Sequence, residues 1–305
     1  MRLKSTFIIC LFCFMRLEPA CSQGNIQKAD SFFFASDWNH AAKLYKDLLK
    51  DTLGSSLHWN RLGLATYNTG KADEALKYFQ KALALNPPAA LKIYAYSRIA
   101  RIYSAKNDRQ KTFQSLDSAI ASGYINYIDL DSLPEYSILR NDAIFRSYRD
   151  KLFKSALPCM SNPKAREFDF WVGEWNAYTT GTNYLAGQSI IQIAAGGCMI
   201  LENWVSENQP YSGKSINFID TTTGKWQQVW VGSDGGGQST FINGEYKDSI
   251  MQFEYDRRDS TGERELGRFR FYNQGPNQVR QLMETSADNG KTWNPVYDFT
   301  YIRKP

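Results

Sequence analysis

Three glutamates of the C-terminal half, Glu202, Glu254 and Glu284, fall within predicted strands and are its best candidates for acid-base chemistry. A pair of carboxyl groups facing each other could cleave a glycosidic bond, and a carboxyl that points into an apolar interior has a raised pKa. Because side chains alternate along a strand, Glu202 and Leu201 lie on opposite faces of the sheet, so Glu202 could also face water. A carbohydrate- or lipid-active enzyme that uses these carboxylates is therefore one of two functional hypotheses.

Histidine chemistry is excluded from the C-terminal half, because His40 and His58 are the only histidines of the chain. That half lacks the base of a Ser-His-Asp triad, a histidine zinc site and a histidine ligand for haem. The glycine-rich stretch 232–237 does not lead into a predicted helix and lacks the lysine of a phosphate-binding loop. We therefore expect no catalytic residue, no metal and no cofactor, and we favour the second hypothesis, a non-enzymatic binding or adaptor protein.

Residues 286–293 carry the spacing of an Asp-box, Ser-x-Asp-x-Gly-x-Thr-Trp. The pattern resembles a motif of sialidases and other glycan-active propellers. Such propellers carry several copies, whereas this chain has one copy and a C-terminal half of about 140 residues, too few for six four-stranded blades. We interpret the motif as a turn in which Asp288 accepts hydrogen bonds from backbone amides while Trp293 packs beneath.

The first 22 residues have the order of a secretory signal: Arg2 and Lys4, then the apolar stretch 6–15, then Ala20, Cys21 and Ser22. We favour cleavage before Gln23 over lipidation at Cys21, because Glu18 and Pro19 fit poorly before a lipidated cysteine. An apolar stretch of about ten residues is too short to span a bilayer. We expect an exported bacterial protein, periplasmic or secreted, with a lipid anchor at Cys21 as the alternative.

Removal of residues 1–22 leaves two cysteines, Cys159 and Cys198. They could form a disulfide in an oxidising compartment. Alternatively, Cys198 is reduced and buried within the apolar stretch 197–201, since a buried cysteine behaves as a small hydrophobic residue. We favour the reduced form.

The chain of 305 residues divides into two unlike halves. Residues 23–158 carry 19 basic and 13 acidic side chains, and residues 159–305 carry 14 basic and 17 acidic ones. Neither half has the dense basic cluster of a nucleic-acid-binding protein, and no apolar run of the mature chain reaches the length of a membrane span. We predict a helical domain over 23–157, a linker over 158–164 and a β domain over 165–305.

The helical half repeats with a period of 34 residues, since Ala29, Ala41 and Tyr45 recur as Gly63, Ala75 and Phe79. Residues 56–89 resemble one tetratricopeptide repeat, with the motif residues Trp59, Leu62, Gly63, Ala75, Phe79, Ala82 and Pro87. Weaker copies flank it, and the third is displaced by 3 positions around Pro87 and Pro88. Residues 124–155 are predicted to form helices that cap the array.

This resemblance implies a concave surface, formed by the first helix of each pair, that binds protein or peptide partners. The candidate contacts are the positions of these helices that the repeat pattern leaves free: Asn60, Tyr67, Tyr94, Arg98 and Arg101. Arg98 and Arg101 share one helical face and could meet carboxylates of a partner, or they are simply solvated.

From residue 165 onward, short apolar-polar alternations separated by turn residues predict ten antiparallel strands. The predicted strands are 174–179, 188–194, 199–206, 212–220, 225–233, 239–246, 249–257, 265–273, 278–286 and 296–303. An up-and-down barrel is favoured over a sandwich, because closure removes exposed edges.

Gly173-x-Trp175 opens the first of these strands, and Arg303 lies in the last one. This arrangement resembles lipocalins and related calycin barrels, in which a basic residue of the last strand packs over the motif tryptophan. The resemblance implies a cavity for a small, mostly apolar molecule. Whether the barrel is hollow or filled by its own aromatics stays open. The candidate cavity or core residues are Trp175, Trp204, Trp226, Trp230 and Arg303.

Overall fold

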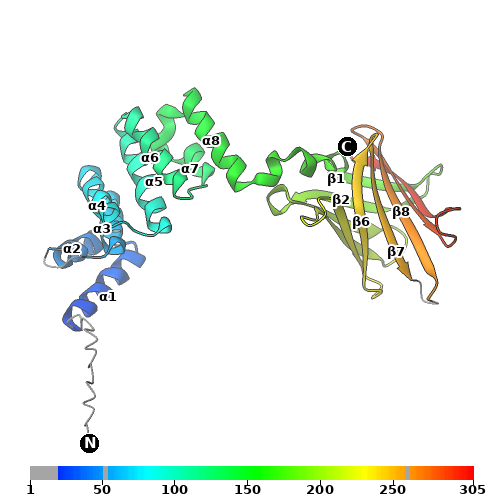
Figure 1. The fold of residues 1–305 in the computed structure, drawn as a ribbon, viewed down its shortest axis with the longest axis horizontal. Coiled ribbons are helices and arrows are strands. Elements are labelled where there is room, and N and C mark those ends of the chain that lie inside the picture. The colour runs from blue at the N-terminus through cyan, green and yellow to red at the C-terminus, as the bar shows by residue number, and fades with distance from the viewer. Residues whose placement is uncertain (1–19, 51–53, 259–261) are drawn as a thin grey trace, which may run out of the picture. The chain divides into compact units, whose positions relative to one another are not determined.

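The computed structural model describes residues 20–50, 54–258 and 262–305. The predicted signal peptide, residues 1–22, lies outside the residues whose side chains are described, as does the predicted lipidation site Cys21. The chain divides into two compact units between Leu152 and Phe153. The first unit is helical and the second contains the β-sheet (Figure 1).

Six helices form three successive antiparallel pairs in the first unit, and a short α-helix, a 3-10 helix and a further α-helix follow them. The bounds are α1 Ala20–Phe34, α2 Trp38–Leu48, α3 Ser56–Asn68, α4 Ala72–Ala84, α5 Ala89–Ala105, α6 Arg109–Ala121, α7 Tyr127–Ser132, the 3-10 helix η1 Pro134–Leu139, and α8 Ala143–Ala156. Within the described residues, none of these helices is long and apolar enough to cross a membrane.

The helix pairs follow the predicted period. The turn between α1 and α2 recurs 34 positions later between α3 and α4, and the turn between α5 and α6 follows after 37 positions. Helix α5 has 17 residues where α3 has 13, so the extra residues lengthen the start of α5. The predicted displacement of the third copy by three positions is therefore confirmed.

Small residues allow the two helices of a pair to approach each other. A Cβ on Gly63 in α3 would lie 2.7 Å from the ring of Phe79 in α4, so only glycine permits this crossing. At the end of the array, α7, η1 and α8 cover the last pair with buried side chains: Leu130, Tyr136, Leu139, Phe145 and Leu152 pack in one cluster with Ala100 and Leu116. These elements cap the array, because their apolar side chains cover the exposed face of the third pair.

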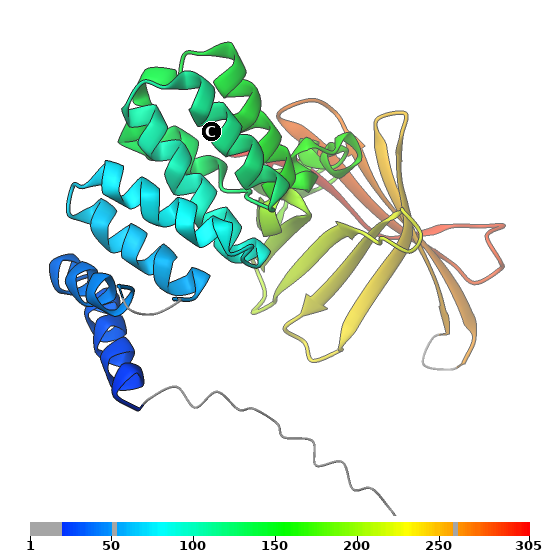
Figure 2. The same cartoon turned by 60° about the vertical axis from the view of Figure 1, so that its left-hand side comes forward.

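The second unit is a closed barrel of ten antiparallel strands in sequence order, in which β1 pairs with β10. Figure 2 shows its strands, coloured from green to red along the chain. The strands are β1 Gly173–Thr179, β2 Leu185–Ala194, β3 Met199–Ser206, β4 Ser212–Ile219, β5 Trp226–Gly232, β6 Gln238–Lys247, β7 Ile250–Arg258, β8 Arg264–Asn273, β9 Gln278–Ser286 and β10 Asn294–Arg303. Every strand begins and ends within three residues of its predicted bounds, and the closed order excludes the sandwich.

A disulfide joins Cys159 to Cys198, with the two Cα atoms 4.9 Å apart. Cys159 lies in the 3-10 helix η2, Pro158–Ser161, within the predicted linker, and Cys198 follows η5, Ala195–Gly197, between β2 and β3. The preference for a reduced, buried Cys198 was wrong. Positive φ angles at Gly196 and Gly197 turn the chain so that Gly197 is buried against Met160 and Cys198 is exposed.

Candidate functional site

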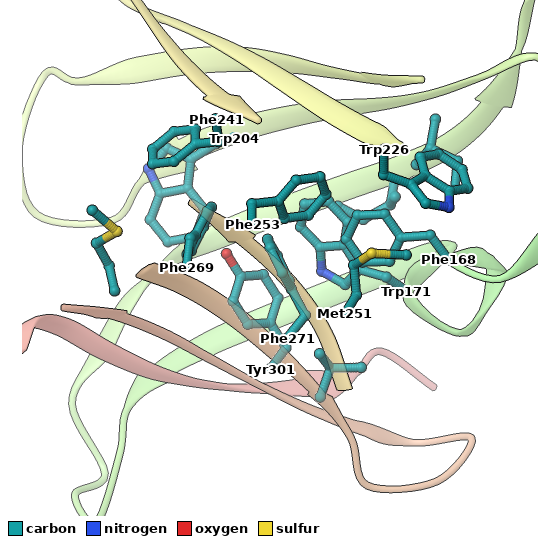
Figure 3. Close-up of a cluster of buried hydrophobic side chains, with 14 of the residues drawn as sticks. Phe168, Trp171, Trp204, Trp226, Phe241, Met251, Phe253, Phe269, Phe271 and Tyr301 are labelled. Atoms are coloured by element: carbon teal, nitrogen blue, oxygen red, sulfur yellow. The ribbon is translucent and has the colours of Figure 1, made fainter. Parts of the chain in front are cut away.

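One end of the barrel is filled by aromatic side chains. Phe168 directly precedes the 3-10 helix η4, Asp169–Trp171, and Trp171 ends it. Both rings lie against Phe271, with ring centroids 4.9 and 4.7 Å from that of Phe271 (Figure 3). Trp175 and Trp226 are buried in the same cluster. The indole nitrogen of Trp175 donates to the carbonyl oxygen of Trp171 at 2.8 Å. This end therefore has a solid core.

Arg303 packs over Trp175, with its guanidinium carbon 4.2 Å from the ring centroid. The two residues are register partners on β10 and β1. This is the contact that the lipocalin resemblance implies. Arg303 belongs to the wall of the barrel and does not line its cavity.

The other end of the barrel is hollow, with a cavity of about 660 Å³. Ten of the described residues that line it are aromatic, among them Trp204, Trp230, Phe241, Phe269, Tyr297 and Phe299. Exposed residues, among them Asn208, Gln209 and Val296, mark its mouth. The sequence left open a hollow or a filled barrel, and the structure shows one filled end and one hollow end.

Glycines in neighbouring strands keep this end hollow. Gly187 lies against the ring of Trp204, Gly213 against Trp230, and Gly267 against Tyr255, each so closely that a Cβ would overlap the ring. The three rings therefore lie along the wall, because a glycine in a strand allows close approach. Trp204 and Trp230 thus line the cavity, whereas Trp175 and Trp226 belong to the core.

Glu202 points into the cavity. Strand β3 buries Ile200, Glu202 and Trp204 in alternation, and the cavity lining includes Glu202 and Trp204 but not the intervening Asn203. The sequence left open whether Glu202 faces water, and the structure shows that its side chain lies on the inner face of β3. Glu202 is 3% exposed.

Two serine hydroxyls bind the Glu202 carboxylate. Ser189 Oγ donates to Oε1 and Ser215 Oγ donates to Oε2, both at 2.9 Å. Burial raises the pKa of Glu202 to about 7, although the two serine hydrogen bonds act in the opposite direction. The carboxyl therefore changes charge near neutral pH.

A chain of buried amides continues from this site. Asn217 Nδ2 donates to Ser215 Oγ at 3.1 Å, and Gln228 Nε2 donates to Asn217 Oδ1 at 2.7 Å. The network holds Ser215 in position for Glu202 and brings Gln228 to the cavity wall. No sequence motif identified these residues; inward alternation on β4 and β5 is the signal that could have found them.

The other two candidate glutamates face away from the cavity. Glu284 binds Arg268 at 2.7 Å and also pairs with Arg270 on the outer face, and Glu254 is exposed. Glu265 lines the mouth, where it pairs with Arg257 at 2.8 Å. Strand alternation places Glu254 and Glu284 on the outer face, so the three glutamates of the alternative enzyme hypothesis do not face one another inside the barrel. The described residues contain no group of three or more potential metal ligands close enough to hold an ion.

The Asp-box forms the predicted turn between β9 and β10. Asp288 Oδ1 accepts from the backbone amides of Lys291 and Thr292, both at 2.9 Å, and Oδ2 accepts from Thr292 Oγ1 at 2.6 Å. These hydrogen bonds, with that of the Thr292 side chain the largest contribution, lower the pKa of Asp288 to about 2. The motif fixes a turn, as its sequence predicted.

The helical unit has a smaller pocket of about 290 Å³ on the first helices of the three pairs. Phe34 of α1, Asn60 of α3, and Tyr94 and Arg98 of α5 line it. Arg98 lies over the Tyr94 ring at 5.1 Å, and Tyr94 is 54% exposed. Asn60 Oδ1 and Arg98 Nε are buried without a hydrogen-bond partner. Three of the five predicted partner contacts therefore meet in one pocket.

The other two predicted contacts, Tyr67 and Arg101, bind a carboxylate of the chain itself. Tyr67 donates to Glu135 Oε1, and Arg101 Nη2 donates to the same oxygen at 2.6 Å. Glu135 lies in η1, so one of the elements that cap the array contacts these side chains of α3 and α5. Burial and the bond to Glu135 raise the pKa of Tyr67 to about 12. Arg101 therefore has a carboxylate partner within the chain, and its contact with a partner protein stays a prediction.

Comparison with known proteins supports the helical assignment. Residues 59–89 match the family model described as tetratricopeptide repeat. No curated protein matches this sequence. The chain therefore carries a tetratricopeptide repeat, a module of protein interaction, in a helical unit that is followed by a closed ten-stranded antiparallel barrel.

Proposed function

We propose that this chain is an exported binding protein whose barrel holds a small ligand and whose helical unit binds a protein or peptide partner. The observation that carries the proposal is the barrel's asymmetry, with one end packed solid and the other enclosing about 660 Å³. Ligand pockets commonly have volumes of about 300 to 1,000 Å³, mostly apolar walls and a few oriented polar groups. The cavity volume lies in that range, aromatic side chains form part of the lining, and Glu202 with its serine and amide partners supplies oriented polar groups.

Export is supported by two features. The first 22 residues have the order of a signal peptide. The Cys159–Cys198 disulfide is of the kind that persists in oxidising compartments such as the periplasm or the extracellular space.

The barrel is tested with a neutral fluorescent probe, N-phenyl-1-naphthylamine. We expect the mature protein to bind one probe molecule per chain and Ser206→Trp to weaken binding at least tenfold, because Ser206 lines the cavity. The matched control is Val205→Trp, whose position is 58% exposed on the outer face of the same strand. Equal binding of the probe by both variants would contradict a ligand-holding barrel. Native mass spectrometry of the protein purified from its own host would detect a retained ligand.

A partner at the helical pocket is favoured by the two polar atoms without a partner, Asn60 Oδ1 and Arg98 Nε. A buried polar atom that lacks a hydrogen bond is costly, and a bound chain would remove that cost. Quantitative affinity capture from the host envelope fraction tests this. Asn60→Ala/Arg98→Ala should lose a specific partner that the wild type and Lys77→Ala, an exposed control on α4, both retain. Equal recovery by all three proteins would remove the pocket from the interaction.

A further inference from the structure

The charge of the barrel cavity is unbalanced. Among the described residues that line it, the charged side chains are Glu202, Arg257 and Glu265. Arg257 and Glu265 pair with each other at the mouth, with their side chains 55% and 26% exposed. Glu202 lies buried in the interior and no cationic side chain is its partner among those residues. The interior therefore contains one carboxyl group and no positive charge to balance it.

The serine hydroxyls that bind Glu202 are neutral and leave its charge uncompensated. Burial of an ionised carboxylate is costly unless a positive charge pairs with it. The effect of this charge reaches across the lumen. Burial, and next the charge of Glu202, raise the pKa of Tyr297 and of Tyr301 on β10. The same negative charge of Glu202 would attract a cation in the cavity.

Aromatic faces surround the same space. Trp204 stacks on Phe299 with ring centroids 5.8 Å apart, and Phe299 stacks on Tyr297 at 5.0 Å. Trp230 lies on the wall, against Gly213. The face of an aromatic ring carries negative potential and attracts ammonium groups, most strongly for tryptophan and after desolvation. The walls and Glu202 thus favour the same sign of ligand charge.

We propose that the barrel cavity binds a small organic cation, an alkylammonium or arylalkylammonium ion whose charged nitrogen lies against Glu202 and whose apolar part lies among Trp204, Trp230 and Phe299. This inference rests on the proposed ligand-holding function of the barrel and adds the class of the ligand. An anion of the same shape would be repelled by Glu202, and a neutral molecule would leave its charge unpaired.

Three probes that share the same phenylbutyl group test the sign of the charge: 4-phenylbutylamine, 4-phenylbutan-1-ol and 5-phenylpentanoate. Each is titrated calorimetrically into the full mature protein at pH 8, where the amine is protonated and Glu202 is ionised. We expect the amine to bind at least tenfold more tightly than the alcohol, and the carboxylate to bind most weakly. Glu202→Gln should reduce the amine's affinity at least tenfold, to about that of the alcohol, and Glu254→Gln, an exposed control, should leave it unchanged.

An alcohol or carboxylate that binds as tightly as the amine would overturn the proposal, and so would an amine affinity that Glu202→Gln does not change. If Glu202→Gln fails to fold, the ratio of the wild-type affinities for the amine and the alcohol tests the proposal without any variant. These failures are distinct from failure of the proposed function. A protein that binds N-phenyl-1-naphthylamine in the cavity but does not prefer the amine remains a small-molecule receptor, whereas one that binds none of the four probes is not a receptor of this kind.

Discussion

Arg303 and Trp175 join the last strand of the barrel to the first, with the guanidinium carbon 4.2 Å from the centroid of the indole ring. The Arg303 Nε also donates to the carbonyl oxygen of Pro276 at 2.6 Å. Gly173, two residues before Trp175, has a φ of +145°, and a Cβ there would overlap the guanidinium. The Gly-x-Trp motif is therefore one half of a contact whose other half lies 128 positions later in the chain.

Gly173→Ala should destabilise the protein by more than about 2 kcal/mol, because an L side chain is strained at this φ and its Cβ would displace Arg303. Urea unfolding followed by near-ultraviolet circular dichroism measures the change. Gly236→Ala is the control, since a Cβ there would lie 3.4 Å from a flexible Asp234 side chain and the φ is ordinary.

The overlap with Arg303 also predicts coupling. Arg303→Ala should cost less stability in the Gly173→Ala background than in the wild type, because the second substitution relieves part of the overlap. Strictly additive effects of the two substitutions would show that backbone strain alone accounts for the role of Gly173.

Much of this architecture follows from local sequence patterns. Strict alternation located the ten strands, because a barrel has one apolar and one polar face on each strand. The period of 34 located the helix pairs, because small residues must recur where helices cross. The contact between Trp175 and Arg303 could be anticipated only through the lipocalin resemblance.

The functional interior was harder to predict. Alternation alone does not say which face of β3 is the inner one, and Glu202 is a charged residue that normally lies outside. The inner face is identified by Ser215, which the register places directly opposite Glu202 on β4, and by Ser189, which lies diagonally across from Glu202 on β2. Likewise, Glu135 reaches Arg101 across 34 positions of sequence, and Cys159 reaches Cys198 across 39. Such pairings depend on tertiary structure and have no local signal.

The raised pKa of Glu202, about 7 against an ordinary 4.5, predicts a stability that falls as pH rises. Between these two pH values the folded protein holds a proton that the unfolded chain has released. The contribution of Glu202 to the free energy of unfolding is therefore fully present below pH 4.5 and is lost as pH rises through 7. It amounts to on the order of 3 kcal/mol. Glu202→Gln should remove this part of the pH dependence of the free energy of unfolding, whereas Glu254→Gln should keep it. Parallel curves for wild type and Glu202→Gln between pH 4.5 and 8 would argue against a carboxyl buried without a counter-ion.

Glu135 predicts the opposite dependence on pH. Burial acts to raise its pKa, but hydrogen bonds from Tyr67 and Arg101 outweigh burial and lower it below its ordinary value. Its contribution is present above the unfolded pKa of about 4.5 and is lost as pH falls. Glu135→Gln should cost about 2 kcal/mol at pH 7, because it leaves the partly buried Arg101 without its carboxylate.

The control for Glu135 is Asp73→Asn, which removes the exposed partner of Lys106 in the same helical unit. Its cost should be about 0.5 kcal/mol or less, because solvent screens an exposed ion pair. Far-ultraviolet circular dichroism during urea unfolding compares the two variants. Equal costs would mean that Glu135 is only a surface partner of Arg101 and does not fix the cap to the array.

The disulfide closes a loop that begins before the barrel and ends between its second and third strands. Because Cys159 and Cys198 are 39 positions apart, restriction of the unfolded chain alone predicts a stabilisation of about 4 kcal/mol. Cys159→Ser/Cys198→Ser should therefore lower the urea midpoint of the barrel, measured by near-ultraviolet circular dichroism. Dithiothreitol should lower the wild-type midpoint to that of the variant and leave the variant's midpoint unchanged. If the oxidised wild type and the variant unfold at the same urea concentration, the loop is already restrained by its other contacts, among them the packing of Met160 on Gly197.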